Sequence, residues 1–154
     1  MQEELETRFG AESQRYDLDG GEGTAKFWCV ADRVALVALW GRASMDTVRW
    51  TLERHDEVKN RCEARGKRMY LALWYGGLSL IDPGTRQALA SWCGKNRDSV
   101  SRVVAISHDP IVRMAGFTIN MLFGNTGRMA KTDREFLDVV DGWVRYIDQQ
   151  SAAR

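Results

Sequence analysis

The chain has few of the residues that point directly to a function. Its 154 residues include only two prolines, three cysteines and two histidines, and the basic and acidic residues nearly balance at 22 and 21. Three cysteines without metal-ligand spacing are typical of a reducing compartment, where cysteine packs as a small hydrophobe. A formal charge of +1 gives no broad field for nucleic acid or an anionic membrane, although a local basic patch stays open, and we expect no nucleic-acid partner.

Long hydrophobic runs are also lacking. No apolar run approaches the roughly 18 residues that span a bilayer, and the first residues, MQEELETRFG, are acidic and lack the apolar core of a signal peptide. A chain of this length is large enough for one domain with its own hydrophobic core. We therefore expect a single cytoplasmic domain without a membrane span.

The first 23 residues are polar and end in the glycine-rich stretch DLDGGEGT. Such composition is typical of a linker that does not pack into a core. We expect a flexible N-terminal arm over residues 1–23, with at most a helical turn near residues 3–9, followed by a folded domain over residues 24–150.

Beyond the arm, apolar runs typical of buried strands alternate with segments of helical periodicity. KFWCV and VALVALW are separated by ADR and indicate a hairpin. RMYLALWY, VVAIS and a short run around residues 128–131 are the later strands, and helical segments separate and follow them. This order predicts an α/β fold with a mixed, mainly parallel five-stranded sheet and four helices, joined by right-handed crossovers.

Capping residues mark the predicted helix starts. Ser44 stands before the first long helix, and both prolines directly follow an aspartate, at Asp82 and Asp109. An aspartate N-cap followed by proline at the first helical position is a favourable start, so the corner LSLIDPGTRQALASW is predicted to be mainly a capping corner. Thr132 and Glu135 have the spacing of a reciprocal capping box.

Catalytic and metal-binding patterns are weak. His55 falls on the apolar face of the first long helix and is predicted to be a packed or surface histidine without a catalytic role. His108 ends the fourth predicted strand, where ligands gather in open α/β sheets. It stands between Ser107 and Asp109, but adjacency along a strand end does not build a catalytic triad. No cluster has metal-ligand spacing and no glycine-rich loop joins a strand to a helix, so we expect no enzymatic activity, cofactor or metal.

The stretch PIVRMAGFTINMLF, residues 110–123, is predicted to be a helix with more apolar surface than one sheet face can cover. Its candidate contact residues are Ile111, Met114, Phe117 and Met121. Three explanations stay open: cover by the N-terminal arm or the last helix, an interface with a partner or a second copy, and a pocket for an apolar ligand.

Two stretches carry a family resemblance. YLALWYGGLSLIDPGTRQALASW resembles the strand-to-helix corner of STAS domains (sulfate transporter and anti-sigma-factor antagonist). SRVVAISHDPIVRMAGFTINMLFGNTGRMAKTDREFLDVVDGWV is similar to the C-terminal half of bacterial SpoIIAA-like proteins. The resemblance covers roughly residues 26–147 and implies the SpoIIAA-like fold, which STAS domains share with Sec14-type lipid-binding domains.

The chain departs from the STAS pattern at this corner. STAS antagonists carry Asp-Ser-Ser-Gly or a near variant there, and a partner kinase phosphorylates a serine. This chain has Asp82, Pro83, Gly84 and Thr85 instead. The phosphoacceptor serine is therefore missing, and the Thr85 hydroxyl, on the first turn of the following helix, could replace it.

These observations predict a non-enzymatic regulatory or protein-interaction module on a STAS-like scaffold. We expect it to bind a protein partner or a second copy of itself, as a homodimer, through the 111–123 helix and the strand-end loops with Asp82, Thr85 and His108. The alternative is a lipid or small apolar-ligand binding protein of Sec14-like type.

Overall fold

A computed structural model describes residues 1–10, 13–110, 113 and 126–153. It contains a mixed six-stranded sheet in the order β1-β2-β3-β4-β5-β6. The strands are β1 (Gln14–Asp17), β2 (Gly23–Val30), β3 (Val34–Ala43), β4 (Met69–Ile81), β5 (Val100–Ile106) and β6 (Gly127–Met129). The described α-helices are α1 (Gln2–Phe9), α2 (Met45–Glu63), α3 (Thr85–Lys95) and α5 (Asp133–Ala152). The α/β class and the mixed sheet are confirmed, whereas the expected number of five strands is wrong.

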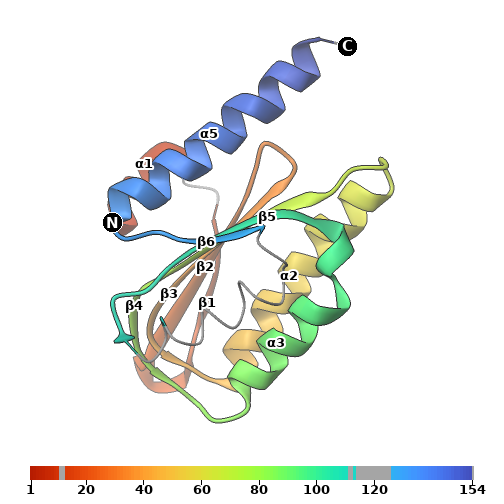
Figure 1. The fold of residues 1–154 in the computed structure, drawn as a ribbon. Helices are drawn as coiled ribbons and strands as arrows, with labels where there is room; N and C mark the ends of the chain where they lie inside the picture. The colour runs from red at the N-terminus through yellow and green to blue at the C-terminus, as the bar shows by residue number, and fades with distance from the viewer. Residues whose placement is uncertain (11–12, 111–112, 114–125, 154) are drawn as a thin grey trace.

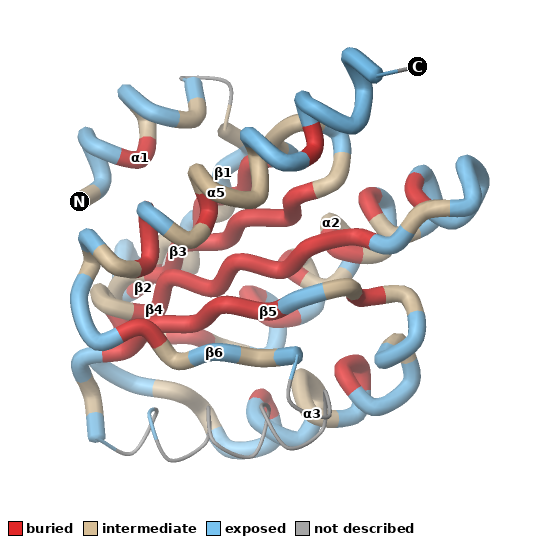
Figure 2. The backbone as a smooth tube through the Cα atoms, turned by 45° about the horizontal axis from the view of Figure 1, so that its top comes forward, coloured by how far each residue is buried: buried red, intermediate tan, exposed pale blue. Residues whose placement is uncertain are grey.

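The helices lie in two layers, one on each face of the sheet (Figure 1). α2 and α3 cover one face, and α1 and α5 cover the other. Successive residues of a strand point to opposite faces of the sheet. Leu71 and Leu73 of β4 therefore belong to the core under α2 and α3, while Tyr70 and Ala72 belong to the core under α1 and α5. The central strands are buried on both sides (Figure 2), which explains their continuous apolar sequences.

The strand directions give the sheet two distinct ends. β1, β2 and β3 pair in antiparallel fashion, and β3, β4, β5 and β6 are parallel. We name the two ends of the sheet after its parallel strands. The amino end is where these strands begin, and the carboxyl end is where they finish. β4 pairs with β5 only as far as Trp74, but with β3 as far as Ile81. The β3–β4 pair therefore extends past β5 at the carboxyl end.

Two of the predicted helix starts are confirmed. The Ser44 hydroxyl accepts from the Thr47 amide at 3.2 Å, and the Thr47 hydroxyl accepts from the Ser44 amide at 3.3 Å. At α5, the Thr132 hydroxyl accepts from the Glu135 amide at 3.1 Å. The Glu135 carboxylate bonds the Lys131 amide at 2.8 Å, one residue before the position that a capping box predicts.

The N-terminal arm differs from the expectation of a flexible segment. Residues 2–9 form α1, and residues 14–17 form β1, the additional strand of the sheet. Leu5 is fully buried in the α1/α5 core. Glu6 forms an ion pair with the buried Lys26 of β2, and the Trp28 indole N–H donates to the Gly10 carbonyl at 3.0 Å. Contacts with residues far along the chain therefore hold the arm in place.

The 111–123 helix predicted from the sequence lies outside the described residues, apart from residue 113. The four candidate contact residues on it, Ile111, Met114, Phe117 and Met121, are not described. Within the described part of the chain, no helix has both the length and the apolar character needed to cross a membrane.

His55 lies in the core between the sheet and α2, so it is a packed and not a surface histidine. Only 1% of its surface is exposed, and neither ring nitrogen has a hydrogen-bond partner among the described residues. Its ring lies between Phe27 and Trp92, with centroid distances of 5.8 and 5.3 Å. Burial lowers its pKa to about 4, because the charged imidazolium would lose its hydration there.

The buried His55 is expected to make the protein less stable in mild acid. An unfolded histidine has a pKa of about 6.5, so the unfolded state takes up the proton first as the pH falls. The free energy of unfolding should not depend on this group above pH 6.5. It should fall by about 3 kcal/mol in total as the pH drops from about 6.5 to about 4.

Urea unfolding of the wild type and of His55→Leu at pH 7.0, 5.5 and 4.5 measures this contribution. As the pH falls, the free energy of unfolding of the wild type should decrease relative to that of His55→Leu. A Val58→Ala variant, which weakens the same core without removing a titratable group, serves as the matched control and should show the pH dependence of the wild type. If the wild type and His55→Leu showed parallel pH dependences, the assignment would be wrong.

Candidate functional site

Arg42, near the end of β3, joins three segments at the carboxyl end of the sheet. Its Nε and Nη2 donate to the two carboxylate oxygens of Asp82 at 2.7 and 2.9 Å. Its Nη1 donates to Glu22 Oε2 at 2.8 Å. The side chains are partly exposed, but the two-point geometry with Asp82 fixes direction as well as distance. This pair holds the end of β4 against β3.

The predicted capping role of Asp82 is wrong. α3 begins at Thr85, and its N-cap is Gly84, which has a φ of +85° and makes no side-chain cap bond. A left-handed residue at this position suits glycine. The Asp82 carboxylate is directed to Arg42 instead, because the guanidinium offers it two charge-assisted hydrogen bonds.

Thr85 is buried directly beneath this corner. No part of it is exposed, and its hydroxyl donates to the Asp82 carbonyl at 2.6 Å. The structure thus brings Asp82 and Thr85 together, as the sequence predicts. The hydroxyl faces the interior of the corner, so a kinase would not reach it in this conformation.

A second cluster at the same end centres on Asp133, at the start of α5. The indole N–H of the buried Trp74 donates to Asp133 Oδ1 at 2.9 Å, and His108 Nε2 lies 3.4 Å from the same oxygen. The Trp40 ring packs on Trp74 with a centroid distance of 5.2 Å. The cluster combines residues from β3, β4, α5 and the chain after β5, and it orients a histidine side chain that is 54% exposed.

Gly76 is required by this close packing. A Cβ atom there would lie 2.6 Å from the Trp74 ring and 3.0 Å from His108 Cδ2. Any larger residue would therefore clash first with the Trp74 ring, and the Trp74 and His108 side chains could not both keep their places beside Asp133.

The neighbours of His108 do not form a catalytic arrangement with it. Ser107 is buried, and its hydroxyl accepts from the Asp109 amide at 3.2 Å, while His108 faces Asp133. Adjacent side chains at the strand end thus meet different neighbours, so the geometry lends no support to a Ser-His-Asp triad. Within the described residues, no group of three or more His, Cys, Asp or Glu side chains could hold a metal ion.

Two exposed apolar side chains lie at the same end of the sheet as the Arg42–Asp82 pair. Among the described residues, the exposed large hydrophobic side chains are Met45 at 41%, Leu80 at 56% and Tyr146 at 51%. Leu80 stands opposite Arg42 in the β3–β4 register, and Met45 Sδ lies 3.9 Å from the Cβ position of Gly84. We call Arg42, Met45, Leu80 and Asp82 the carboxyl-end patch.

The sequence analysis found Asp82, Thr85 and His108 at this end but missed three of their neighbours. Arg42 and Asp133 were missed because their partners lie 40 and 25 residues away. Trp40 was missed because it ends the apolar run VALVALW, which predicts only a buried strand. A weak signal existed for Arg42, which is the first charged residue after the apolar run VALVALWG.

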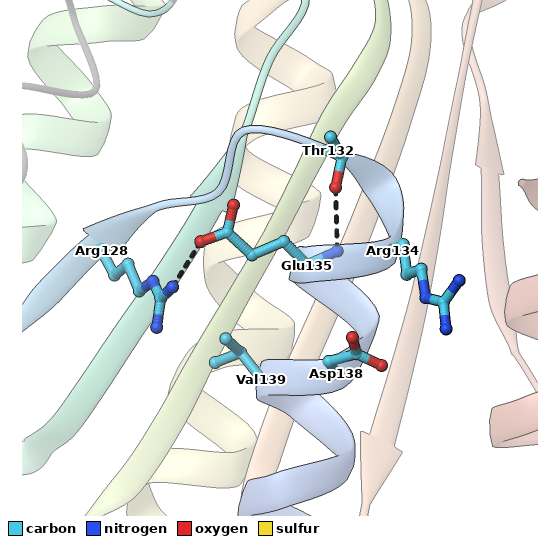
Figure 3. Close-up of a pocket in the computed structure, with 6 residues that line it drawn as sticks. All are labelled: Arg128, Thr132, Arg134, Glu135, Asp138 and Val139. Carbon is cyan, nitrogen blue, oxygen red and sulfur yellow. Dashed lines mark hydrogen bonds and ion pairs between the residues drawn. The ribbon is translucent and has the colours of Figure 1, made fainter.

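A separate open pocket lies where β6 leads into α5 (Figure 3). It is lined by Arg128, Thr132, Arg134, Glu135, Asp138 and Val139. Arg128 pairs with Glu135 across it, so its charges largely compensate one another. Five of its six lining residues are polar or charged, which does not suit an apolar ligand.

Comparisons of this chain with protein-family models, with curated proteins and with solved structures find no match. The fold and the geometry at the two ends of the sheet are therefore the basis for a functional assignment.

The Arg42–Asp82 pair is expected to be visible in the titration of Asp82. Hydrogen bonds from Arg42 hold the pKa of the Asp82 carboxyl below its ordinary value. In a carboxyl-carbon NMR titration, an Arg42→Gln variant should return this pKa to the ordinary range for aspartate. Arg86→Gln, on the exposed side of α3, is the matched control and should leave it unchanged. The same Asp82 pKa in the wild type and Arg42→Gln would show that the pair does not form in solution.

Proposed function

We propose that this protein is a non-enzymatic protein-interaction module that binds a protein partner or a second copy through the carboxyl-end patch. One observation carries the proposal. Two of the three exposed large hydrophobic side chains among the described residues, Met45 and Leu80, lie at the carboxyl end, where Leu80 stands opposite Arg42 of the charge pair. Apolar side chains with a polar rim are typical of interaction surfaces.

The backbone beneath the patch supports this role. Leu80 belongs to the part of β4 that pairs with β3 past the end of β5. Arg42 and Asp82 fix the end of this strand, and the Asp82 amide donates to the Ala43 carbonyl at 3.0 Å. A surface that is already ordered loses less conformational entropy on binding. The half-exposed His108, oriented by Asp133, adds a polar contact at the same end.

The scaffold we propose is SpoIIAA-like, and the module would act as a cytoplasmic regulator. The resemblance of two sequence stretches supports this, and four neighbouring parallel strands with helices on both faces are compatible with it. The burial of Thr85 and its bond to the Asp82 carbonyl favour a module that is not switched by phosphorylation at this corner. The Sec14-like alternative, a carrier of an apolar ligand, receives no support from the charged pocket beside α5.

The test compares Met45→Asp combined with Leu80→Asp against Tyr146→Asp, which alters the third exposed hydrophobic residue, on α5. Each protein is used to capture partners from native lysate, and its mass is measured by light scattering. The wild type and Tyr146→Asp should retain the same stoichiometric partner, or the same dimer. The double variant should lose at least tenfold in affinity, because burying each apolar side chain contributes about 1.5–3 kcal/mol.

Thermal unfolding establishes that the double variant is folded. A folded double variant that keeps the partner and mass of the wild type would refute the proposal. So would a wild type that is monomeric and captures nothing in a stoichiometric amount.

A further inference from the structure

Basic residues are concentrated at the amino end of the parallel strands. Three segments meet there: the β2–β3 turn (31–33), the end of α2 with the start of β4 (61–68), and the end of α3 with the start of β5 (95–102). We call them the amino-end surface; in Figure 1 they lie on the side opposite the β4–α3 corner. They hold eight of the 22 basic residues and three of the 21 acidic ones. The amino-end surface thus has a formal charge of +5, and the rest of the chain has −4.

Three of the eight cations have contacts within the fold. Arg65 lies 3.6 Å from the Asp32 carboxylate, and Arg61 donates to Cys29 Sγ at 3.1 Å. Arg33 donates to the Arg68 carbonyl at 2.9 Å and lies over a tyrosine ring. These three side chains help to hold the β2–β3 turn and α2 in place.

The side chains of the other five cations make no ion pair or hydrogen bond with any described residue. They are Lys67, Arg68, Lys95, Arg97 and Arg102, and all but the half-buried Lys67 are exposed. Of the segments that lie wholly or largely outside the described residues, 111–125 contains no Asp or Glu, and 11–12 contains one glutamate. The three acidic residues of the surface offset only part of its charge, and the contacts of the described residues do not use these five cations.

We propose that the amino-end surface binds the phosphate backbone of nucleic acid. Six of its eight cations are arginine, whose planar fork matches phosphate oxygens at two points. The cations come from the starts of three neighbouring strands, which lie about 4.8 Å apart, and from two helix ends. A spread of this kind suits a polymer of regularly spaced charges, because a single small anion would contact only part of it.

The surface fits nucleic acid better than a membrane. Peripheral membrane segments add apolar side chains that enter the bilayer interface, but Met45 and Leu80 lie at the opposite end of the sheet. Contacts to phosphates alone give binding that does not depend on base sequence. The formal charge of the whole chain, +1, hides this local excess and led to the expectation of no nucleic-acid partner.

The experiment measures binding of a fluorescently labelled 20-base-pair DNA duplex and a 20-nucleotide RNA by anisotropy between 50 and 200 mM salt. The test variant is Arg68→Glu combined with Arg97→Glu. The matched control is Arg86→Glu combined with Arg134→Glu, which makes the same change in net charge at other exposed positions. Thermal unfolding of both variants shows whether they are folded.

The wild type should bind at least one probe, with an affinity that falls steeply with salt. Five phosphate contacts to the duplex correspond to a slope of about −4.5 in log K against log salt. The test variant should lose at least tenfold in affinity at 100 mM salt, and the control less than threefold. Equal losses in both variants would overturn the proposal, because net charge alone would then explain binding.

Two other results would also overturn it. One is the absence of binding to either probe at 50 mM salt. The other is binding of the wild type to vesicles that contain phosphatidylserine without binding to nucleic acid, which would assign the surface to membranes. Neither result bears on the carboxyl-end patch, which lies at the other end of the sheet and is tested by different variants.

Discussion

The parallel pairing of β3 with β4 is the interaction on which the rest of the structure depends. It extends from Val34 opposite Tyr70 to Ala43 opposite Ile81, and both strands are buried on both faces along most of this length. Because the two strands have apolar residues on each side, helices must cover both faces. Because they run in the same direction, α2 must carry the chain back along the sheet from the end of β3 to the start of β4. The loops between strands and helices therefore lie at two opposite ends of the sheet. The carboxyl end receives the Arg42–Asp82 pair, and the amino end receives the basic loops.

Much of this architecture follows from local sequence patterns. The continuous apolar runs predicted the central strands, and Ser44 and Thr132 predicted the starts of α2 and α5. The N-terminal arm was not predictable in the same way, because its order comes from distant partners. Among its described residues, Leu5 is the one fully buried apolar side chain, and the bond of Glu6 to Lys26 needs β2 to be in place. A polar segment with few apolar residues therefore folds as α1 and β1, although its composition is typical of a linker.

The sequence predicted the candidate sites only in part, again because their contacts join residues that are distant along the chain. Asp82 and His108 were placed at the carboxyl end because strand ends are where sites gather in open α/β sheets. The role of Asp82 was not predictable from local rules, because Arg42 is 40 residues away and competes with the helix N-terminus for its carboxylate. The charge of the amino end was hidden for a different reason. The net charge of the whole chain does not show that the basic segments 61–68 and 95–102 lie next to each other in the fold.

Amide hydrogen exchange along β4 is the measurement that tests the account most directly. If β3 and β4 form one ordered ribbon beyond β5, the amides of residues 77–82 that bond β3 exchange slowly. The Asp82 amide, which donates to the Ala43 carbonyl at 3.0 Å, should be among them. Their protection should approach that of residues 69–74, which pair with strands on both sides. Exchange of residues 77–82 at the rate of an unstructured loop, with residues 69–74 still protected, would contradict the account. The carboxyl end would then lack the ordered strand on which the proposed interaction surface is built.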